Sequence, residues 1–216
     1  MRRVPSRAVY DRAAIDEILD EAMIAHLGFV HEGQPFVIPT LHARVGDTVY
    51  FHGSAASRAI RTLSSGVAAC LTVTLLDGLV LARSAFHTSL NYRSVVMLGS
   101  ATAVAGPDER RLALQAFMER LIPGRWVEVR PPSAKELKGT RVLALPLDET
   151  SAKVRTGPPE DDRSDLELPV WAGVIPLHTT AGAPIPDRLT PPQSTASVAV
   201  TTWTPQRKTN TPRSIA

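Results

Sequence analysis

The sequence predicts a mainly β protein with α-helical inserts, built as an antiparallel β-barrel. Six or more apolar or alternating segments are separated by short turns, whereas only a few stretches show helical periodicity. With 216 residues, the chain is long enough to bury the core of one domain. Hydrophobic residues make up 44% and aromatic residues 5%, so we expect a soluble globular protein with a mostly aliphatic core.

The N-terminal part is expected to form one helix followed by two hairpins. Asp11 is a suitable N-cap, and apolar residues recur behind it at three- and four-residue spacing as far as Met23. The pattern then becomes that of strands, with turn residues at Glu32-Gly33 and at Gly46-Asp47. The strands are expected over residues 27–31, 36–44 and 48–52.

The middle of the chain is expected to contain a short helix and three further strands. Gly53 interrupts the preceding strand, Ser54 can cap the helix, and Gly66 ends it. Asp77-Gly78 is typical of a tight turn between two strands. The expected elements are a helix over residues 55–63 and strands over residues 67–76, 79–84 and 92–105.

The C-terminal part returns to mixed helices and strands before the composition changes. We expect helices over residues 108–121 and 133–137, and strands over residues 140–147, 152–155 and 170–176. Residues 1–189 are assigned to a single domain. Residues 190–216 form a tail rich in Pro, Thr and Ser that we expect to be disordered. Within this tail, residues 198–203 alternate as a short edge strand would, and the alternative to a disordered extension is an arm laid across a partner subunit.

Charge and composition exclude several classes of protein. The sequence pI is about 9.3, but the tail holds three bases and no acid, so the remaining 189 residues carry 21 bases and 21 acids. The balanced domain gives no reason to expect a nucleic-acid partner. No apolar segment follows Arg2 and Arg3, and no run approaches the ~20 residues of a membrane span. We therefore expect a cytoplasmic protein without a membrane partner.

Common catalytic and metal-binding motifs are not found. The sequence has no glycine-rich nucleotide loop, no nucleophile elbow and no close His/Cys spacing of the kind that binds zinc. The single cysteine, Cys70, excludes a disulfide framework. The chemistry of this protein is therefore expected to come from a bound cofactor, and we expect no metal site.

A first cluster of polar residues, 50–61, runs from a strand through a turn of small residues into a helix. Ser57 and Arg58 stand at the start of that helix, and Arg61 follows one turn later. Free N–H groups, the positive end of the helix dipole and an arginine together suit a phosphate group. The alternative is an ordinary capped helix with surface arginines.

A second cluster, residues 83–94, is dense in hydrogen-bonding groups between two apolar strands. Its end continues into a strand that should place Tyr92 and Ser94 on the same side. The alternative is an ordinary polar surface loop.

Five segments in order carry a resemblance to a known family. They are the Tyr-Phe-His-Gly-Ser turn at 50–54, the Ser-Arg helix start at 57–58, the apolar strand, the Ser-Leu-Asn-Tyr-Arg-Ser-Val-Val strand at 89–96 and Val-Trp-Ala-Gly-Val at 170–174. Over residues 10–189 the chain resembles the pyridoxamine 5′-phosphate oxidase-like FMN-binding split barrels. It looks closest to their flavin-nucleotide-binding, nitroimidazole-resistance-like branch. The resemblance implies an antiparallel split β-barrel that binds FMN as a homodimer, in a groove between the subunits.

The resemblance also implies a set of FMN-binding residues. Ser57, Arg58 and Arg61 would hold the phosphate, and the flavin ring would lie along the strand that contains Val37, Ile38, Pro39 and Thr40. The turn residues Gly53 and Ser54, with His52 as the weak candidate for a catalytic residue, would border the site. The same site would be completed by Ser89, Asn91, Tyr92, Ser94 and Trp171.

The pattern departs from the family at two places. Members often carry a lysine where this chain has Ala59, which weakens the expected phosphate contact. The segment Arg188-Leu189-Thr190-Pro191 is similar to the end of true pyridoxamine phosphate oxidases, but the chain continues past it, so we do not assign the vitamin substrate. We expect an FMN-dependent oxidoreductase acting on a small acceptor. The alternative is a flavin or haem carrier without turnover, because no acid, base or nucleophile constellation accompanies the flavin residues.

Overall fold

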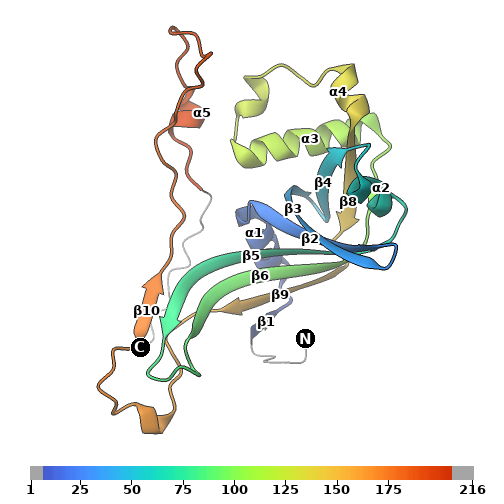
Figure 1. Ribbon diagram of the computed structural model, residues 1–216. Helices are drawn as coiled ribbons and strands as arrows, with labels where there is room; N and C mark the ends of the chain where they lie inside the picture. The colour runs from blue at the N-terminus through green and yellow to red at the C-terminus, as the bar shows by residue number, and fades with distance from the viewer. Residues whose placement is uncertain (1–6, 206–216) are drawn as a thin grey trace.

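The computed structural model describes residues 7–205, which form one long antiparallel sheet curled into a barrel (Figure 1). The strands follow the order β1-β9-β6-β5-β2-β3-β4-β8-β7, and β10 pairs with the far end of β5. The predicted mainly β barrel is confirmed. The strands are β1 (Ala8–Val9), β2 (Ile24–His31), β3 (Gln34–Val45), β4 (Thr48–Ser54), β5 (Ala68–Leu81), β6 (Ser89–Ser100), β7 (Thr102–Ala103), β8 (Thr140–Pro146), β9 (Glu149–Arg155) and β10 (Gly173–Pro176).

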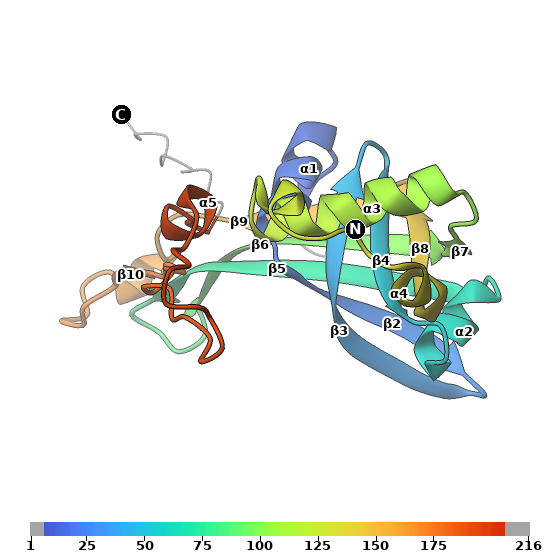
Figure 2. The same cartoon turned by 90° about the horizontal axis from the view of Figure 1, so that it is seen from above.

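Short helices close the barrel or cover its outer face. The helix α1 packs into one end of the barrel, where its buried side chains Ile15, Ile18 and Leu19 join the main aliphatic core. The helix α3 lies across β3, β4 and β8, and Phe117 anchors a second, smaller core there (Figure 2). The helices are α1 (Arg12–Glu21), α2 (Arg58–Ser64), α3 (Pro107–Leu121), α4 (Ala134–Gly139) and α5 (Val198–Thr201), with short 3₁₀ turns η2 (Arg125–Val127) and η3 (Arg163–Asp165).

The N-terminal elements follow the sequence pattern closely. The side chain of Asp11 accepts a hydrogen bond from the N–H of Ala14 at 2.9 Å, which confirms the predicted N-cap. The two predicted hairpins are present as β2–β3 and β3–β4. Glu32 and Gly33 both adopt positive φ angles, 50° and 78°, as a tight two-residue hairpin turn requires.

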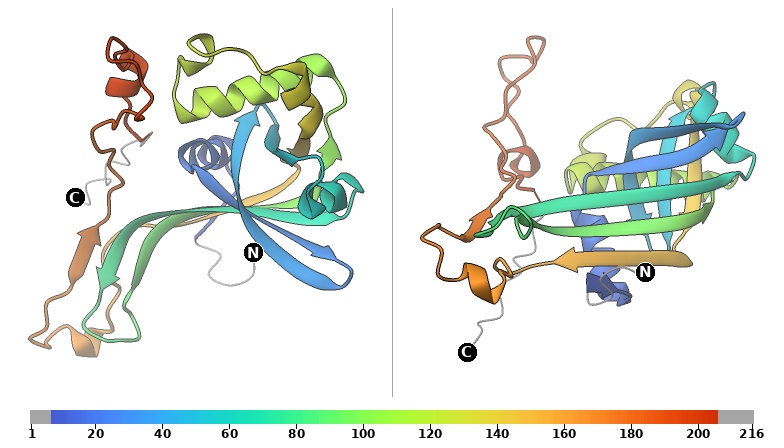
Figure 3. Two further views of the ribbon diagram at one scale, coloured as in Figure 1. Left: turned by 45° about the horizontal axis from the view of Figure 1, so that its top comes forward. Right: turned by 60° about the horizontal axis from the view of Figure 1, so that its bottom comes forward.

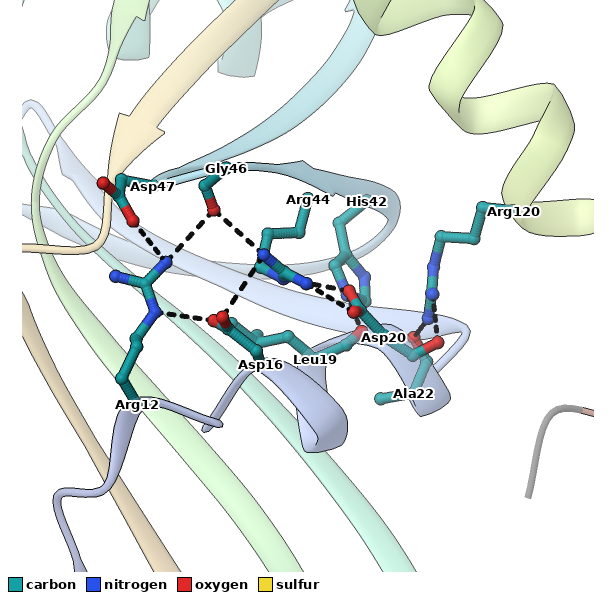
Figure 4. A network of polar contacts seen from close by, with 10 residues as sticks. All are labelled: Arg12, Asp16, Leu19, Asp20, Ala22, His42, Arg44, Gly46, Asp47 and Arg120. Atoms are coloured by element: carbon teal, nitrogen blue, oxygen red, sulfur yellow. Dashed lines mark hydrogen bonds and ion pairs between the residues drawn. The ribbon is translucent and has the colours of Figure 1, made fainter. Parts of the chain in front are cut away.

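A polar network fixes the C-terminal end of α1 against the barrel (Figure 4). The last carbonyl groups of a helix have no partner within the helix and must be satisfied from outside. His42 Nε2 lies 2.9 Å from the Leu19 carbonyl, and the guanidinium of Arg120 on α3 donates to the carbonyls of Asp20 and Ala22. Arg44 adds an ion pair to the Asp20 carboxylate. Two elements, β3 and α3, therefore hold the end of α1 in place.

The prediction of a turn at Asp77-Gly78 was wrong. β5 runs through both residues, with a register shift between Leu76 and Gly78, and the chain turns only after Leu81. The Asp77 carboxylate binds the buried guanidinium of Arg93 on the neighbouring strand. A Cβ atom at Gly78 would lie 3.0 Å from the carbonyl oxygen of Ile175, so glycine allows β10 to pack closely. Contacts with β6 and β10 therefore explain why Asp77 and Gly78 occur inside a strand.

Two other boundaries differ from the sequence-based expectation. The helix α2 begins at Arg58, and its N-cap is Ser57 rather than Ser54, with Ser57 Oγ accepting from the N–H of Ile60 at 3.2 Å. The predicted strand over residues 92–105 begins earlier and breaks at the buried Ala101, where the chain passes to pair with β8. The break lets one continuous segment serve both halves of the split barrel.

The β5–β6 hairpin extends beyond the barrel as an arm, and β10 lies along its edge (Figure 3). The chain then returns as an extended, exposed segment toward the side of α3, where Ser197 Oγ donates to Glu128 at 2.9 Å. The edge strand predicted over residues 198–203 was wrong, because Val198–Thr201 form a short helix. The last eleven residues of the predicted disordered tail, 206–216, lie outside the described residues. Between residues 7 and 205, no helix is long and apolar enough to span a membrane.

Candidate functional site

A hollow of about 340 Å³ separates the end of β2 from one face of α2. Arg58 and Arg61 are exposed on the helix side, and neither forms an ion pair with any residue that the structure describes. Two free guanidinium groups on one wall make the hollow a suitable place for an anion. The lining residues are Val30, His31, Glu32, Arg58, Arg61, Thr62, Ser65 and Val67.

Arg58 connects this hollow to β3. Its guanidinium carbon lies 4.4 Å from the centre of the Phe36 ring, a cation–π contact that orients the side chain along the strand. Because α2 has only seven residues, its dipole is small, and the charges of the arginines dominate the potential at the hollow. The structure thus brings Ser57, Arg58 and Arg61 together beside the start of β3.

The strand that contains Val37, Ile38, Pro39 and Thr40 has an open edge. Residues 34–41 pair with β2 on one side, whereas only residues 42–45 pair with β4 on the other. Val37 is 67% exposed, and Pro39, which lacks an N–H donor, is tolerated because no strand pairs with this edge among the described residues. This edge offers free main-chain donors and acceptors next to Arg58, an arrangement that suits a flat, hydrogen-bonding ring.

Gly53 and Ser54 determine how the start of α2 packs against β4. A Cβ atom at Gly53 would lie 2.9 Å from Cγ1 of Ile60, so only glycine lets α2 pack this closely on β4. Ser54 Oγ accepts from the N–H of Ala56 at 3.3 Å. Both residues therefore position Ser57 and Arg58, and a direct contact with a cofactor remains a prediction for them.

His52 lies under α3 and outside the hollow. Its ring centre is 4.5 Å from that of Phe117, and burial lowers the pKa of its imidazole. His52 Nδ1 is buried, and no residue of the described range forms a hydrogen bond with it. The structure places this imidazole in the smaller core, and its proposed catalytic role remains a prediction.

The second predicted cluster lies at the other end of the sheet. Ser89 pairs with Val80, which is twelve residues beyond the start of β5, or about 40 Å along the strand. Tyr92 and Ser94 share a face, as predicted, because they alternate with the buried Asn91 and Arg93. Figures 1 and 3 show the arm that carries these residues pointing away from α2.

Asn91 and Trp171 have different surroundings on this arm. Asn91 is buried and accepts from Arg155 at 2.5 Å while its amide nitrogen donates to the Gly157 carbonyl at 3.0 Å. Trp171 is 66% exposed and precedes β10 on the arm. Within the chain, the predicted site residues thus form two separate groups.

Sequence reasoning missed part of the hollow. His31 Nδ1 lies 2.9 Å from Thr62 Oγ1, which joins the end of β2 to α2. The available signal was the spacing of Arg58, Arg61, Thr62 and Ser65, which share one helix face. Within the described part of the chain, no group of three or more His, Cys, Asp and Glu side chains is arranged to hold a metal ion.

Fold and site together define the class: a split antiparallel barrel with an arginine-lined hollow beside an open strand edge. The family model described as pyridoxamine 5′-phosphate oxidase matches residues 11–154. The chain belongs to this family. A comparison with curated proteins found no match.

Solved structures extend the similarity beyond the segment that the family model covers. The flavocytochrome Anf3 from Azotobacter vinelandii is 43% identical, with 93% of each chain covered and a TM-score of 0.88. The FAD and haem binding protein from Mycobacterium smegmatis is 36% identical, with 93% of this chain and 100% of that chain covered and a TM-score of 0.88. A 5-nitroimidazole antibiotic resistance protein described as putative, from Bacteroides thetaiotaomicron, is 23% identical over 68% of this chain and 86% of that chain. Its TM-score of 0.59 supports the fold alone.

Proposed function

We propose that this protein is a flavin-binding redox protein whose flavin phosphate is held by Arg58, with Arg61 beside it. The observation that carries the proposal is the 43% identity, over 93% of both chains, to a protein described as a flavocytochrome. The unpaired arginines and the open edge of β3 support it, because they offer charged and main-chain partners for a phosphate and a flat ring. When bound, a flavin supplies hydride or electron transfer, and the chain binds and orients it.

The proposal includes a homodimer in which the arm of one subunit completes the site of the other. Ser89, Tyr92 and Trp171 lie too far from Arg58 to share a flavin with it inside one subunit. Large apolar side chains on the arm are exposed, as expected for a surface covered by a partner: Phe86, Leu90, Trp171 and Ile175. Light scattering is expected to give a mass near twice 23.3 kDa, and a monomer that retains flavin would contradict this arrangement.

Haem is a second candidate cofactor, favoured by the 36% identical relative that is described as binding FAD and haem. A haem iron needs an accessible ligand such as an imidazole nitrogen. The buried imidazoles do not fit this role, since His42 is fully enclosed and His52 packs on Phe117. His26 and His87 reach the surface, so either imidazole would be able to hold a haem iron.

The cofactors are identified directly on the purified protein. Absorption spectroscopy is expected to show flavin bands, and chromatography of the cofactor released on denaturation distinguishes FMN, which the sequence resemblance implies, from FAD. A pyridine haemochrome assay reports haem. A colourless protein that takes up neither FMN nor FAD would refute the proposal.

Reduction and reoxidation of the bound flavin distinguish an oxidoreductase from a carrier. An oxidoreductase is expected to have its flavin reduced by NADH or NADPH and reoxidised by a small acceptor. Flavin that is never reduced by either donor would support the carrier. The proposal also includes a cytoplasmic location, which cell fractionation tests.

Arg58→Ala is expected to weaken flavin binding by about ten- to a hundredfold, because one charge-assisted hydrogen bond contributes about 1.5–3 kcal/mol. Arg58 is exposed, so the melting temperature of the flavin-free variant should stay close to that of the native protein. Fluorescence titration with FMN and FAD measures the dissociation constants. Arg61→Ala is compared because Arg61 lines the same hollow, and Arg111→Ala, at an exposed arginine outside it, is the matched control. If Arg58→Ala leaves the dissociation constant unchanged and Arg61→Ala greatly weakens flavin binding, Arg61 rather than Arg58 holds the phosphate.

A further inference from the structure

A second hollow, of about 270 Å³, lies on the arm, at the other end of β5 from Arg58. It is formed where the turn after β5 meets the end of β9 and the residues just before β1. Its lining is polar and contains two arginines but a single carboxylate. The lining residues are Arg7, Phe86, His87, Thr88, Ser89, Arg155 and Glu160.

Arg155 is the buried charge of this hollow. The residue is 5% exposed, and within residues 7–205 its guanidinium donates only to neutral acceptors: Asn91 Oδ1 at 2.5 Å, the Pro158 carbonyl at 3.2 Å and the Gly157 carbonyl at 3.5 Å. Its Nε is buried and has no hydrogen-bond partner among the residues that the structure describes. No carboxylate of the described residues lies within ion-pair distance of it. Buried charges in proteins are normally paired in direct contact, and Arg155 has no such contact with a carboxylate of the described residues.

Arg7 adds a second positive charge to the same hollow. It forms no ion pair with any residue in the described range. Burial, and then the like charge of Arg7, lower the pKa of Arg155 against the opposing charge of Glu160 and the effect of Tyr92. Two guanidinium groups that repel each other across a hollow are stabilised together by one anion placed between them.

The other walls are compatible with an anion. Ser89 contributes a hydroxyl group, and Thr88 Oγ1 already donates to the Ser84 carbonyl. His87 Nε2 lies 3.2 Å from Asp162. Glu160 is an exposed carboxylate on the wall, and it pairs with neither arginine. Its negative charge repels an incoming anion. Removing this charge should therefore strengthen anion binding, whereas removing the charge of an arginine should weaken it.

We propose that this hollow is an anion site in which Arg7 and Arg155 bind one phosphate or carboxylate group. The group can come from a free small anion or from a propionate of a haem bound at the arm. The site shares Ser89 with the proposed border of the flavin, but it uses neither Arg58 nor Arg61, which hold the proposed flavin phosphate. Failure of the flavin proposal therefore leaves the test below intact.

The test compares anion binding in the full-length protein and in charge variants, with inorganic phosphate and malonate as probes at constant ionic strength. Phosphate is expected to raise the melting temperature of the native protein, and Arg7→Gln is expected to weaken its binding about tenfold or more. Without phosphate, Arg7→Gln should melt at the native temperature or higher, since it removes a repulsion. Glu160→Gln should bind phosphate more tightly than the native protein.

Two control variants show whether the phosphate response comes from this hollow. Arg163→Gln removes an exposed arginine outside it, so its phosphate response should match that of the native protein. Arg58→Ala must keep the response, which shows that phosphate is not being detected at the flavin hollow. The proposal is overturned if neither phosphate nor malonate stabilises the native protein, or if Arg7→Gln responds as the native protein does.

Haem loading distinguishes the two sources of the anion. If haem abolishes the phosphate response of the native protein, a propionate occupies the site. If the response persists with haem bound, the ligand is a free anion. Either result requires that the haem-free native protein binds the probe and that Arg7→Gln binds it more weakly.

Discussion

Arg93→Met is expected to lower the free energy of unfolding by about 3–5 kcal/mol, because it leaves two carboxylates in a mostly buried position without their counter-charge. Arg93 is 7% exposed. Its guanidinium binds Glu21 at 2.5 and 2.8 Å and Asp77 at 2.8 and 2.9 Å. The hydrogen bonds to Asp77 and Glu21 raise the pKa of Arg93, so the group stays charged at every accessible pH. The ion triplet joins α1 to β5 and β6.

Urea unfolding of the two proteins measures this loss. Arg141→Met is the matched control, since Arg141 also stands in a strand but is exposed and forms no ion pair with a described residue. That control should change the unfolding free energy by less than about 0.5 kcal/mol. Equal effects of the two substitutions would show that the triplet contributes no more than a surface arginine does.

His42→Gln is expected to make the protein less sensitive to acid. Burial first, and then the charge of Arg120, lower the pKa of His42 from its usual 6.5 to about 4, against the opposing effects of the Leu19 carbonyl and Asp20. Above pH 6.5 the imidazole is neutral in both the folded and the unfolded chain. Between pH 6.5 and 4 the unfolded chain binds a proton that the folded chain does not, so acid favours unfolding. By pH 4 this single group should have removed about 3 kcal/mol of stability.

The comparison is the difference in unfolding free energy between pH 7 and pH 4 for the native protein and for His42→Gln. The glutamine amide can still donate to the Leu19 carbonyl, but it does not titrate. Acid effects of carboxylates are common to both proteins and cancel. The variant should therefore lose about 3 kcal/mol less than the native protein over this range. Identical losses would show that His42 already binds its proton in the folded state.

Local sequence patterns determined much of the architecture. The cap at Asp11 and the glycine turns at Gly33 and Gly46 could be predicted because each depends on residues within one turn or one hairpin. The order of five short motifs was sufficient to indicate the family and the split barrel. The helix start at Ser57 and Arg58 was found in the same way, although its cap was placed three residues too early.

Only the tertiary structure decided the roles of the buried polar groups and the way the site is divided. Asp77-Gly78 looks like a turn in sequence, but a partner sixteen residues away, Arg93, holds Asp77 inside a continuous strand. His42 has no local signal for its burial, because the Leu19 carbonyl that it contacts comes from a distant segment. Arg155 is bound by the nearby carbonyls of Gly157 and Pro158, but its contact with Asn91 depends on the pairing of β6 with β9. The separation of Ser89 from Arg58 likewise follows from the length of β5, which no motif encodes. Short motifs depend on residues that are close together in the sequence, so they could be interpreted without a structure. Burial, charge pairing and the distance between two groups depend on contacts between remote segments, which the sequence alone does not show.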